Sequence, residues 1–417
     1  MRSDWDIIQA DKFIDFNPKE TIRKGELLKK VAMEQLQPYT RDISGYELTP
    51  FNGGSKFRNG DTLMARITPC LENGKIAQVN ILENDEVGFG STEFIVMREI
   101  PDVSDSDFIY YLVISPSWRN KAIKSMVGSS GRQRVQQSVL DSVELCVPSL
   151  PEQREIARTL RALDDKIANN ANINHHLEQM AQAIFKSWFV GFEPFGGVMP
   201  DDWREGTFSE VISATLGGDW GKDTPTGNNT QEVYCIRGAD IPDINVGNKG
   251  KMPIRFILPK NYITKQLAVG DIVIEISGGS PTQSTGRCAL ITQSLLDRYD
   301  RGMVCTNFCR AVKPLEGYSA FVYFYWKYLY DQSVMFSYEN GTTGIKNLDI
   351  TGFLENEPII IPTVGVVAQF TEAVETFIDT IFANGLENEG LATTRDTLLP
   401  RLMSGELPVT NDERNKD

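Results

Sequence analysis

The sequence predicts an α+β protein in which two similar, mainly-β globular domains are separated by two long helices that form an antiparallel coiled coil. Three observations lead to this prediction: a long internal repeat, short apolar runs bounded by turn residues in each copy, and a heptad pattern at the end of each copy. The repeat further predicts a pseudo-two-fold relation between the two halves of the chain.

The repeat is carried by five pairs of segments whose offsets rise along the chain. The pairs are Asp4-Trp5 with Asp202-Trp203, "NGDTLMARI" at 59–67 with "VGDIVIEIS" at 269–277, Phe108–Leu112 with Phe321–Tyr325, Gly128–Gly131 with Gly341–Gly344, and Val147-Pro148 with Ile361-Pro362. The offsets are 198, 210, 213, 213 and 214, which indicates one duplicated unit with insertions in the second copy.

Apolar runs in the first part of each copy predict β-strands. "DTLMARI", "KIAQVNI" and "STEFIVM" in the first copy, and "DIVIEIS" and "GRCALIT" in the second, are short, apolar and bounded by turn residues. "PSLPEQREIARTL" then predicts the start of a long helix, with Pro151 in the first turn, where proline is tolerated.

Both long helices show alternating steps of four and three residues between core positions, which is typical of a coiled coil. The first series is Ile156, Leu160, Leu163, Ile167, Asn170, Asn174, Leu177, Ala181, Ile184 and Trp188. Adding 214 gives Phe370, Val374, Phe377, Ile381, Asn384, Asn388, Leu391, Arg395, Leu398 and Leu402.

Two asparagines occupy matching positions in both series. A buried asparagine costs stability and fixes helix register, so we expect Asn170, Asn174, Asn384 and Asn388 to set the register of a helix pair. In an antiparallel pair Asn170 would lie near Asn388, and Asn174 near Asn384. Replacing them by leucine would then raise stability. The alternative is two unrelated amphipathic helices in separate cores.

These patterns divide the chain into five segments. We expect a first globular domain at 1–150, a central helical region at 151–197, a second globular domain at 198–362, a C-terminal helical region at 363–407 and a flexible acidic tail at 408–417.

Composition is that of a soluble protein with real cores, with 41% hydrophobic and 24% charged residues. The sequence has no apolar run of about 18 residues, and its charged N-terminus is unlike a signal peptide. We therefore expect a cytoplasmic protein that makes no membrane contact.

Motifs for catalysis are missing. The sequence contains neither a G-x-x-x-x-G-K-[ST] loop nor a G-x-G-x-x-G loop after a strand, and its Asn-Pro at 17–18 continues as "NPKE", unlike the motif of amino-methyltransferases. The two histidines, His175 and His176, lie in a helical stretch without a nucleophile motif. Cys305 and Cys309 lack further ligands for a zinc site, and we expect all six cysteines to be reduced, buried and structural. We expect no catalysis, no metal and no cofactor in this chain.

Charge is unevenly distributed within the net −14. Residues 349–417 hold 13 acidic and 4 basic residues, whereas 119–134 and 249–265 each hold five basic residues and no acidic one. Basic patches on an acidic protein favour local binding of phosphates, although a charged stretch is commonly just a solvated surface.

Polar loops near these stretches carry the side chains that read nucleic acids. Arginine pairs with guanine, glutamine and asparagine pair with adenine, and hydroxyl and backbone N–H groups suit phosphates. The alternative for each loop is ordinary turn chemistry. The DNA-contact candidates are Arg66, Asn73, Lys75, Ser129, Ser130, Arg132, Gln133 and Arg134 in the first domain, and Gln283, Ser284, Thr285, Arg287, Thr342, Thr343 and Lys346 in the second.

With these segments in view, the whole chain resembles the specificity subunit of type I restriction–modification systems. The resemblance is carried by "NGDTLMARITPCLENGKIA" with "GFGSTEFIVM", by "VPSLPEQREIARTLRALDDKI" with "LEQMAQAIFKSWFV", and by the closing "TRDTLLPRLMSGEL". The second helical region departs from the family pattern, because it has "PTVGVVAQF" where the first has its "P-E-Q" motif.

The resemblance implies that each globular domain recognises one half of a bipartite site in double-stranded DNA. It implies that the coiled coil sets the half-site spacing and docks two adenine-methyltransferase subunits, which bind S-adenosylmethionine. A motor–nuclease subunit would complete a complex that acts in DNA methylation and host defence. A different class of function, a non-enzymatic bivalent scaffold that binds proteins or glycans, is the alternative, and steep salt dependence of binding would distinguish DNA from it.

Overall fold

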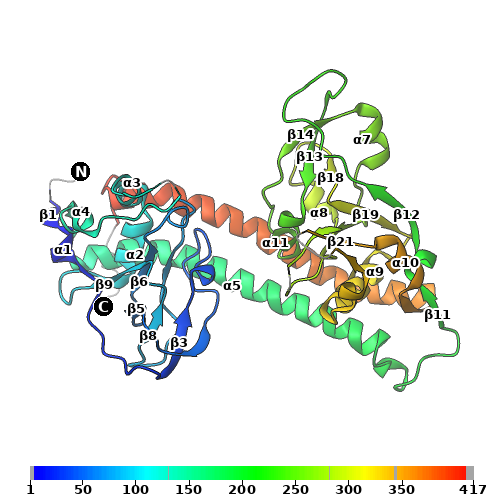
Figure 1. Cartoon of the computed structure of the whole chain (residues 1–417), viewed down its shortest axis with the longest axis horizontal. Helices are drawn as coiled ribbons and strands as arrows, with labels where there is room; N and C mark the ends of the chain where they lie inside the picture. The colour runs from blue at the N-terminus through cyan, green and yellow to red at the C-terminus, as the bar shows by residue number, and fades with distance from the viewer. Residues whose placement is uncertain (1–3, 130, 281, 342–344, 410–417) are drawn as a thin grey trace, which may run out of the picture. The chain divides into compact units, whose positions relative to one another are not determined.

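The computed structural model describes residues 4–129, 131–280, 282–341 and 345–409. The chain forms two compact units, residues 1–168 with 390–417 (the first unit) and residues 169–389 (the second unit). Two 40-residue helices, α5 (Leu150–Phe189) and α11 (Val364–Met403), each contribute one segment to each unit (Figure 1). The structure therefore assigns each helix segment to the globular domain on which it packs.

The first unit contains two four-stranded sheets. Their orders are β2-β9-β6-β7, which is antiparallel, and β4-β3-β8-β5, in which β3 and β8 are parallel. The strands and helices before α5 are β1 (Asp6–Gln9), α1 (Ala10–Phe13), β2 (Ile14–Phe16), β3 (Leu27–Val31), β4 (Glu47–Pro50), β5 (Ser55–Phe57), β6 (Thr62–Ala65), β7 (Ile76–Gln78), β8 (Gly88–Gly90), β9 (Phe94–Glu99), α2 (Ser106–Ile114), α3 (Pro116–Lys124), α4 (Gln137–Asp141) and β10 (Glu144–Val147).

The second unit repeats this topology. Its antiparallel sheet has the order β12-β19-β15-β17, and its mixed sheet β14-β13-β18 has the parallel pair β13 and β18. Its elements are β11 (Arg204–Thr207), β12 (Ile212–Gly217), β13 (Gln231–Ile236), α6 (Ile241–Asn245), β14 (Ile254–Ile257), α7 (Pro259–Lys265), β15 (Ile272–Glu275), β16 (Ser277–Gly278), β17 (Cys288–Leu290), α8 (Gln293–Leu296), β18 (Met303–Cys305), β19 (Cys309–Pro314), α9 (Ser319–Asp331), β20 (Glu339–Asn340), β21 (Lys346–Leu348), α10 (Ile350–Asn356) and β22 (Pro358–Ile361).

Register supports the duplication. Thr62 pairs with Met97 between β6 and β9, and Ile272 pairs with Val312 between β15 and β19. In each unit a strand near the start pairs with the strand that leads into the long helix, β1 with β10 and β11 with β22. The five predicted strand segments all contain strands, so the duplicated α+β fold expected from the sequence is confirmed.

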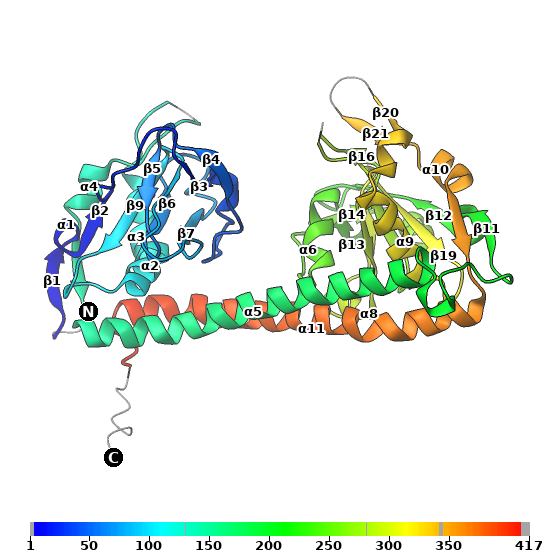
Figure 2. The same ribbon diagram turned by 90° about the horizontal axis from the view of Figure 1, so that it is seen from below.

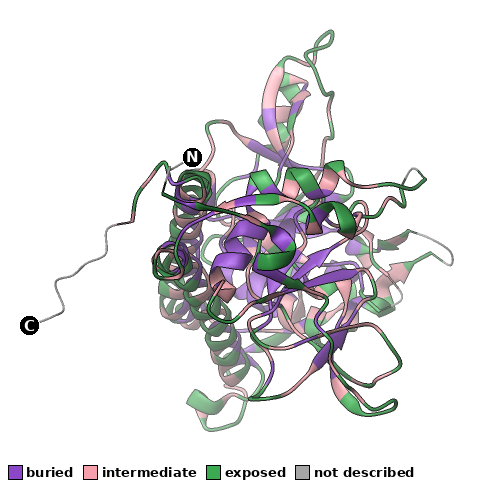
Figure 3. Cartoon of the chain, turned by 90° about the vertical axis from the view of Figure 1, so that its left-hand side faces the viewer, coloured by how far each residue is buried: buried purple, intermediate pink, exposed green. Residues whose placement is uncertain are grey.

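Each central sheet is buried on both faces, which explains why its strands are continuous apolar runs. In β6, Met64 packs in the core beneath α2, whereas Leu63 packs in the core on the opposite side. In β15, Ile272 and Ile274 share the core beneath α9, and Val273 faces the other side. Figure 3 colours the ribbon by burial, with buried segments in purple and exposed segments in green.

The two long helices pack against each other within each unit. In the first unit, Leu160 of α5 and Leu399 of α11 belong to one hydrophobic core with residues of α2. In the second unit, the ring of Phe370 lies 5.9 Å from that of Phe185 and 5.1 Å from that of Phe189. Core positions early in one helix meet positions late in the other, so the segments are antiparallel in both units.

Candidate nucleic-acid interface

In the first unit, three loop segments are joined by backbone hydrogen bonds beyond the end of strand β6. The Arg66 N–H donates to the Glu93 carbonyl over 2.9 Å, and the Val135 N–H donates to the Arg66 carbonyl over 2.8 Å. Arg134 also pairs with Val127 across the loop that contains Gly128 and Gly131. This hydrogen-bonded frame, defined by residues 66–68, 91–93 and 127–135, brings together most of the predicted contacts of the first domain.

Side chains on the first frame are partly engaged in internal contacts. Arg134 holds both oxygens of Glu93 with Nε, at 3.0 Å, and one with Nη2, at 2.6 Å, and this hydrogen bonding lowers the pKa of the Glu93 carboxyl. Arg132 is exposed, and Arg66 is half-buried with its Nη2 directed to the Val135 carbonyl. The first frame therefore presents the guanidinium of Arg132 to solvent, whereas the guanidinium of Arg134 is neutralised by Glu93.

The remaining candidates of the first domain differ in their surroundings. Lys75 Nζ donates to the Met33 carbonyl over 2.8 Å, whereas Asn73 and Ser129 are exposed. Gln133 is fixed through its backbone, since its N–H donates to Thr68 Oγ1 over 3.0 Å. Ser130 lies outside the described residues.

The second unit builds the same frame from different residues. The Ile276 N–H donates to the Phe308 carbonyl over 2.9 Å, and the Leu348 N–H donates to the Ile276 carbonyl over 2.9 Å. Strand β16 pairs with β21, which pairs with β20. Figure 2 shows this small sheet at the end of the second unit that lies away from α5 and α11.

Several predicted contacts of the second domain are internal. Ser284 and Thr285 are buried, and the Thr285 N–H and Oγ1 both donate to Glu339 Oε1, at 2.6 and 2.9 Å. The Thr285 hydroxyl is therefore already bound within the unit and the Ser284 side chain is buried in this conformation, while their assignment as DNA contacts stays a prediction. Turn-like composition gave no sign of this burial.

Charged candidates of the second domain have acidic partners. Arg287 forms a two-bond pair with Glu275, at 2.7 and 2.8 Å, and Lys346 Nζ lies 2.7 Å from Glu339. Gln283 is exposed. Thr342 and Thr343 lie outside the described residues.

Two groups of residues on these frames were not predicted from the sequence. The first is acidic: Glu93, Glu275 and Glu339 pair with Arg134, Arg287 and Lys346. The second is apolar: the exposed side chains of Phe308 and Ile345, together with Trp220 from the loop after β12. Aligning "STEF" at 91–94 with "TNFC" at 306–309 would have placed Glu93 opposite Phe308 in the repeat.

The four helix asparagines lie together in the second unit. Asn170 Nδ2 donates to Asn388 Oδ1 over 3.0 Å, and Asn384 Nδ2 donates to Asn174 Oδ1 over 2.8 Å. These are the cross-helix neighbours expected of an antiparallel pair. Asn174 Nδ2 also donates to the Val246 carbonyl, at 3.1 Å, so this residue joins the helix pair to the globular domain.

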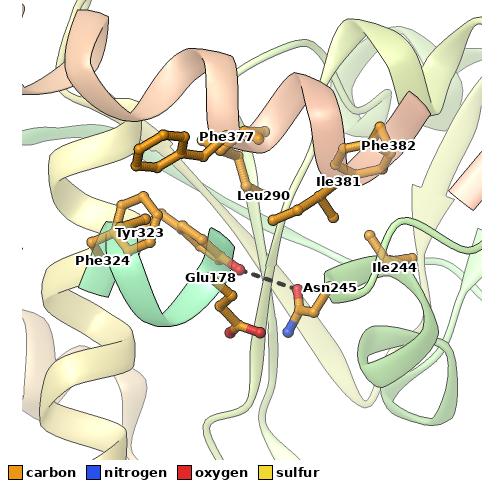
Figure 4. A pocket seen from close by; sticks show the side chains of 11 residues that line it. Glu178, Ile244, Asn245, Leu290, Tyr323, Phe324, Phe377, Ile381 and Phe382 are labelled. Carbon is orange, nitrogen blue, oxygen red and sulfur yellow. Dashed lines mark hydrogen bonds between the residues drawn. The ribbon is translucent and has the colours of Figure 1, made fainter. Parts of the chain in front are cut away.

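In the first unit, a buried polar cluster holds the helix pair to the domain. Arg395 Nη1 lies 2.7 Å from Asp164 Oδ1, and the Tyr111 hydroxyl donates to Asp164 Oδ2 over 2.7 Å. By the repeat offsets of 213 and 214, the equivalent residues in the second unit are Ala181, Ile378 and Phe324, which are apolar. They line a small cavity of about 30 Å³ beneath the helices, where the Tyr323 hydroxyl bonds to Asn245 (Figure 4).

The cysteines, the possible metal ligands and the apolar helices were each compared with what a disulfide, a metal site or a membrane span requires. All six cysteines are free; four are buried, and Cys70 and Cys146 are half-buried. Within the described residues there is no group of three or more His, Cys, Asp or Glu side chains that could hold a metal ion. No helix in the described part of the chain is long and apolar enough to cross a membrane.

Comparison with known proteins shows which proteins this chain is similar to. The model of the type I restriction modification DNA specificity domain matches residues 2–179. The chain is 25% identical to the type I restriction enzyme HindI specificity subunit of Haemophilus influenzae, over 88% of this chain and 90% of that one. It is 26% identical to the MjaIX specificity subunit of Methanocaldococcus jannaschii, over 73% and 69%.

The fold matches a solved structure. The crystal structure of the type I restriction–modification system S subunit from M. genitalium superposes with a TM-score of 0.51 at 17% identity, covering 98% of this chain and 97% of that one. Two copies of one α+β topology and a pair of long antiparallel helices accompany the sequence matches, and over most of its length the chain is similar to specificity subunits of type I restriction–modification systems.

Proposed function

We propose that each unit recognises one half of a bipartite site in double-stranded DNA. The observation that supports this most directly is the repeated frame: the same backbone hydrogen bonds occur in both units, at 2.8–2.9 Å, but carry different side chains. A constant scaffold with variable side chains suits two readers of different base sequences, because base edges specify and backbone contacts position.

In this proposal, α5 and α11 set the separation of the two half-sites and provide the docking surface for two adenine-methyltransferase subunits. Those subunits would bind S-adenosylmethionine and perform the chemistry. A motor–nuclease subunit would join the complex for restriction. This chain itself would contribute specificity and no catalytic group.

The test is methylation-aware sequencing of DNA from a host that expresses the chain with its methyltransferase subunits, compared with a host that lacks the chain. A methylated, two-part motif that appears only with the chain supports the proposal. Methylation that is independent of the chain, or a motif in one continuous block, contradicts it.

A binding measurement separates DNA recognition from the scaffold alternative. The logarithm of the DNA affinity should fall linearly with the logarithm of the salt concentration, by about 0.9 for each phosphate neutralised. Binding to a protein or glycan with no response to DNA would favour the scaffold instead.

A further inference from the structure

Phe308 of the second frame occupies the place of Glu93 in the first. In each case the backbone carbonyl accepts, over 2.9 Å, the N–H of the residue that follows the central strand, Arg66 or Ile276. The equivalence thus rests on hydrogen bonds and does not depend on the choice of a sequence alignment.

The side chains at these equivalent positions are charged in the first frame and uncharged in the second. The first frame carries Arg66, Glu93 and Arg134, and the second carries Ile276, Phe308 and Asn347. Ile345, two residues before Asn347, stands where Arg132 stands in the first frame. The charged face of one unit is replaced by an apolar face in the other.

This apolar face surrounds an open cleft of about 560 Å³ in the second unit. Exposed side chains form its walls: Trp220 is 38% exposed, Phe308 61% and Ile345 66%. Large apolar side chains on a surface cost free energy unless a ligand covers them, so three around one cleft indicate a binding surface.

The cleft is built without a free charge on its floor. Two charged residues line the cleft and each is paired: Arg287 holds Glu275 with two hydrogen bonds of 2.7 and 2.8 Å, and Arg237 Nε lies 2.9 Å from Asp240 Oδ2. Gly238 and Gly278 keep the floor open, since a Cβ on either would meet Glu275 Oε1, at 2.5 and 2.9 Å. The ligand group that fits such a surface is apolar.

Trp220 is held in place before any ligand arrives. Arg255 Nε donates to the Trp220 carbonyl over 2.8 Å, and its guanidinium carbon lies 4.1 Å from the centre of the indole ring. Fixing the ring in the unbound protein reduces the entropy lost on binding.

Only one base presents an apolar group in the major groove of DNA, namely thymine with its 5-methyl group. Burying the polar edge of any other base against these side chains would leave hydrogen-bonding groups unpaired. We propose that the second unit selects thymine in its half-site by packing the 5-methyl group against Phe308, Ile345 and Trp220. This proposal rests on the proposed function.

Deoxyuridine provides a direct test, because it keeps the Watson–Crick edge of thymine and lacks the methyl group. The chain, assembled with its methyltransferase subunits, is titrated with duplexes that carry the methylated motif and have one thymine at a time replaced by deoxyuridine. At least one position in one half-site should weaken binding about fourfold, the effect of losing one buried methyl group. Substitutions in the other half-site should not respond to changes at the apolar face.

The variant Phe308→Ala links the effect to the cleft. It should bind the thymine duplex more weakly and lose the thymine–deoxyuridine difference at that position. Ile345→Ala repeats the test with a second side chain, in case one variant folds poorly. Val269→Ala is the matched control: Val269 is 54% exposed at the opposite end of strand β15, and its removal should leave the difference intact.

The outcomes distinguish this proposal from the proposed function. Specific binding to a bipartite motif with no deoxyuridine effect, or with an effect unchanged in Phe308→Ala and Ile345→Ala, overturns thymine selection and leaves the proposed function standing. If no chain-dependent bipartite motif exists, both proposals fall.

Discussion

Two neighbouring arginines on the first frame differ in what holds them. Arg134 forms an ion pair with Glu93 at 2.6 Å, whereas Arg132 is exposed and forms no ion pair with any residue in the described part of the chain. A guanidinium that already neutralises a carboxylate adds little net positive charge for a phosphate. The two residues should therefore contribute unequally to DNA binding.

Arg132→Ala should lower the salt slope of DNA binding by about one, the value expected for one lost phosphate contact. Arg134→Ala alone should weaken binding more than a neutral change would, because it leaves the Glu93 carboxylate unpaired near the DNA. The measurement is DNA affinity at several salt concentrations for each variant.

The double variant Glu93→Gln with Arg134→Ala serves as the control, since it removes both charges of the pair. Its salt slope should equal that of the unmodified chain. A slope reduced by as much as in Arg132→Ala would mean that Arg134 contacts a phosphate directly.

Asn174 behaves differently from a simple register residue. It accepts a hydrogen bond from Asn384 and donates to the carbonyls of Val246 and Ile381. Asn174→Leu should therefore lower the free energy of unfolding by about 1–3 kcal/mol, the cost of leaving buried polar partners unsatisfied. The gain in stability expected from the sequence does not apply where an asparagine serves two elements.

Chemical denaturation measures this change. Asn172→Leu is the matched control, because Asn172 lies exposed on the same helix and its replacement should change stability by no more than about 0.5 kcal/mol. Equal stability of the Asn174 and Asn172 variants would contradict the bridging role.

At the scale of elements, α11 contacts the second domain through a pair of glycines. A Cβ on Gly385 of α11 would collide with the backbone of Gly247, and a Cβ on Gly247 would collide with the Ile381 carbonyl. Gly247 also has φ of +81°, which side chains rarely adopt. Two backbones thus approach at a point where neither residue can carry a side chain.

Gly385→Ala should destabilise the protein, although alanine is favoured over glycine inside a helix by about 1 kcal/mol. The collision with Gly247 outweighs that preference because backbone cannot move aside easily. Gly390→Ala, in the same helix but with open space around it, should raise stability by about 1 kcal/mol. Thermal or chemical unfolding of the two variants measures these changes in stability. A Gly385→Ala variant that is more stable than the unmodified chain would show that the backbone of Gly247 moves aside to admit the new methyl group.

Elements were predictable where the signal was local. Short apolar runs bounded by turn residues predicted β6 and β15, and the heptad series predicted both long helices, because residues two to four apart in the sequence share one face of a strand or helix. The ion pair between Glu93 and Arg134 spans 41 residues, and the burial of Thr285 depends on Glu339, 54 residues away. Such long-range partners decide which loop side chains are free, and the loop sequences do not reveal them.

At the scale of the whole molecule, the two domains share one topology, so each could in principle pack on the helix segments that belong to the other. The buried polar cluster of Tyr111, Asp164 and Arg395 in the first unit is replaced by apolar residues at the equivalent positions of the second. Placing a domain on the wrong surface would leave the buried Tyr111 hydroxyl, or the Asp164 oxygen that accepts from it, without its hydrogen bond, which costs about 1–3 kcal/mol. This divergence makes each helix segment specific for its own domain.

The same helices are proposed to determine the distance between the two DNA half-sites. Because both α5 and α11 contribute to each unit, lengthening one alone would disturb its pairing with the other. We therefore expect a clean change only when seven residues are inserted in both, between 168 and 169 and between 389 and 390. Seven residues restore the heptad face closely and lengthen a helix by about 10 Å. That length corresponds to about three base pairs of DNA at about 3.4 Å each.

Sequencing of methylated sites in a host carrying this variant should show the same bases in both half-sites and a spacer changed by about three base pairs. A three-residue insertion at the same two places is the control: it rotates the following helix segment by about 300°, which does not restore the heptad face, so methylation should fall sharply. Retained methylation with an unaltered spacer in the seven-residue variant would mean that the helices do not set the distance.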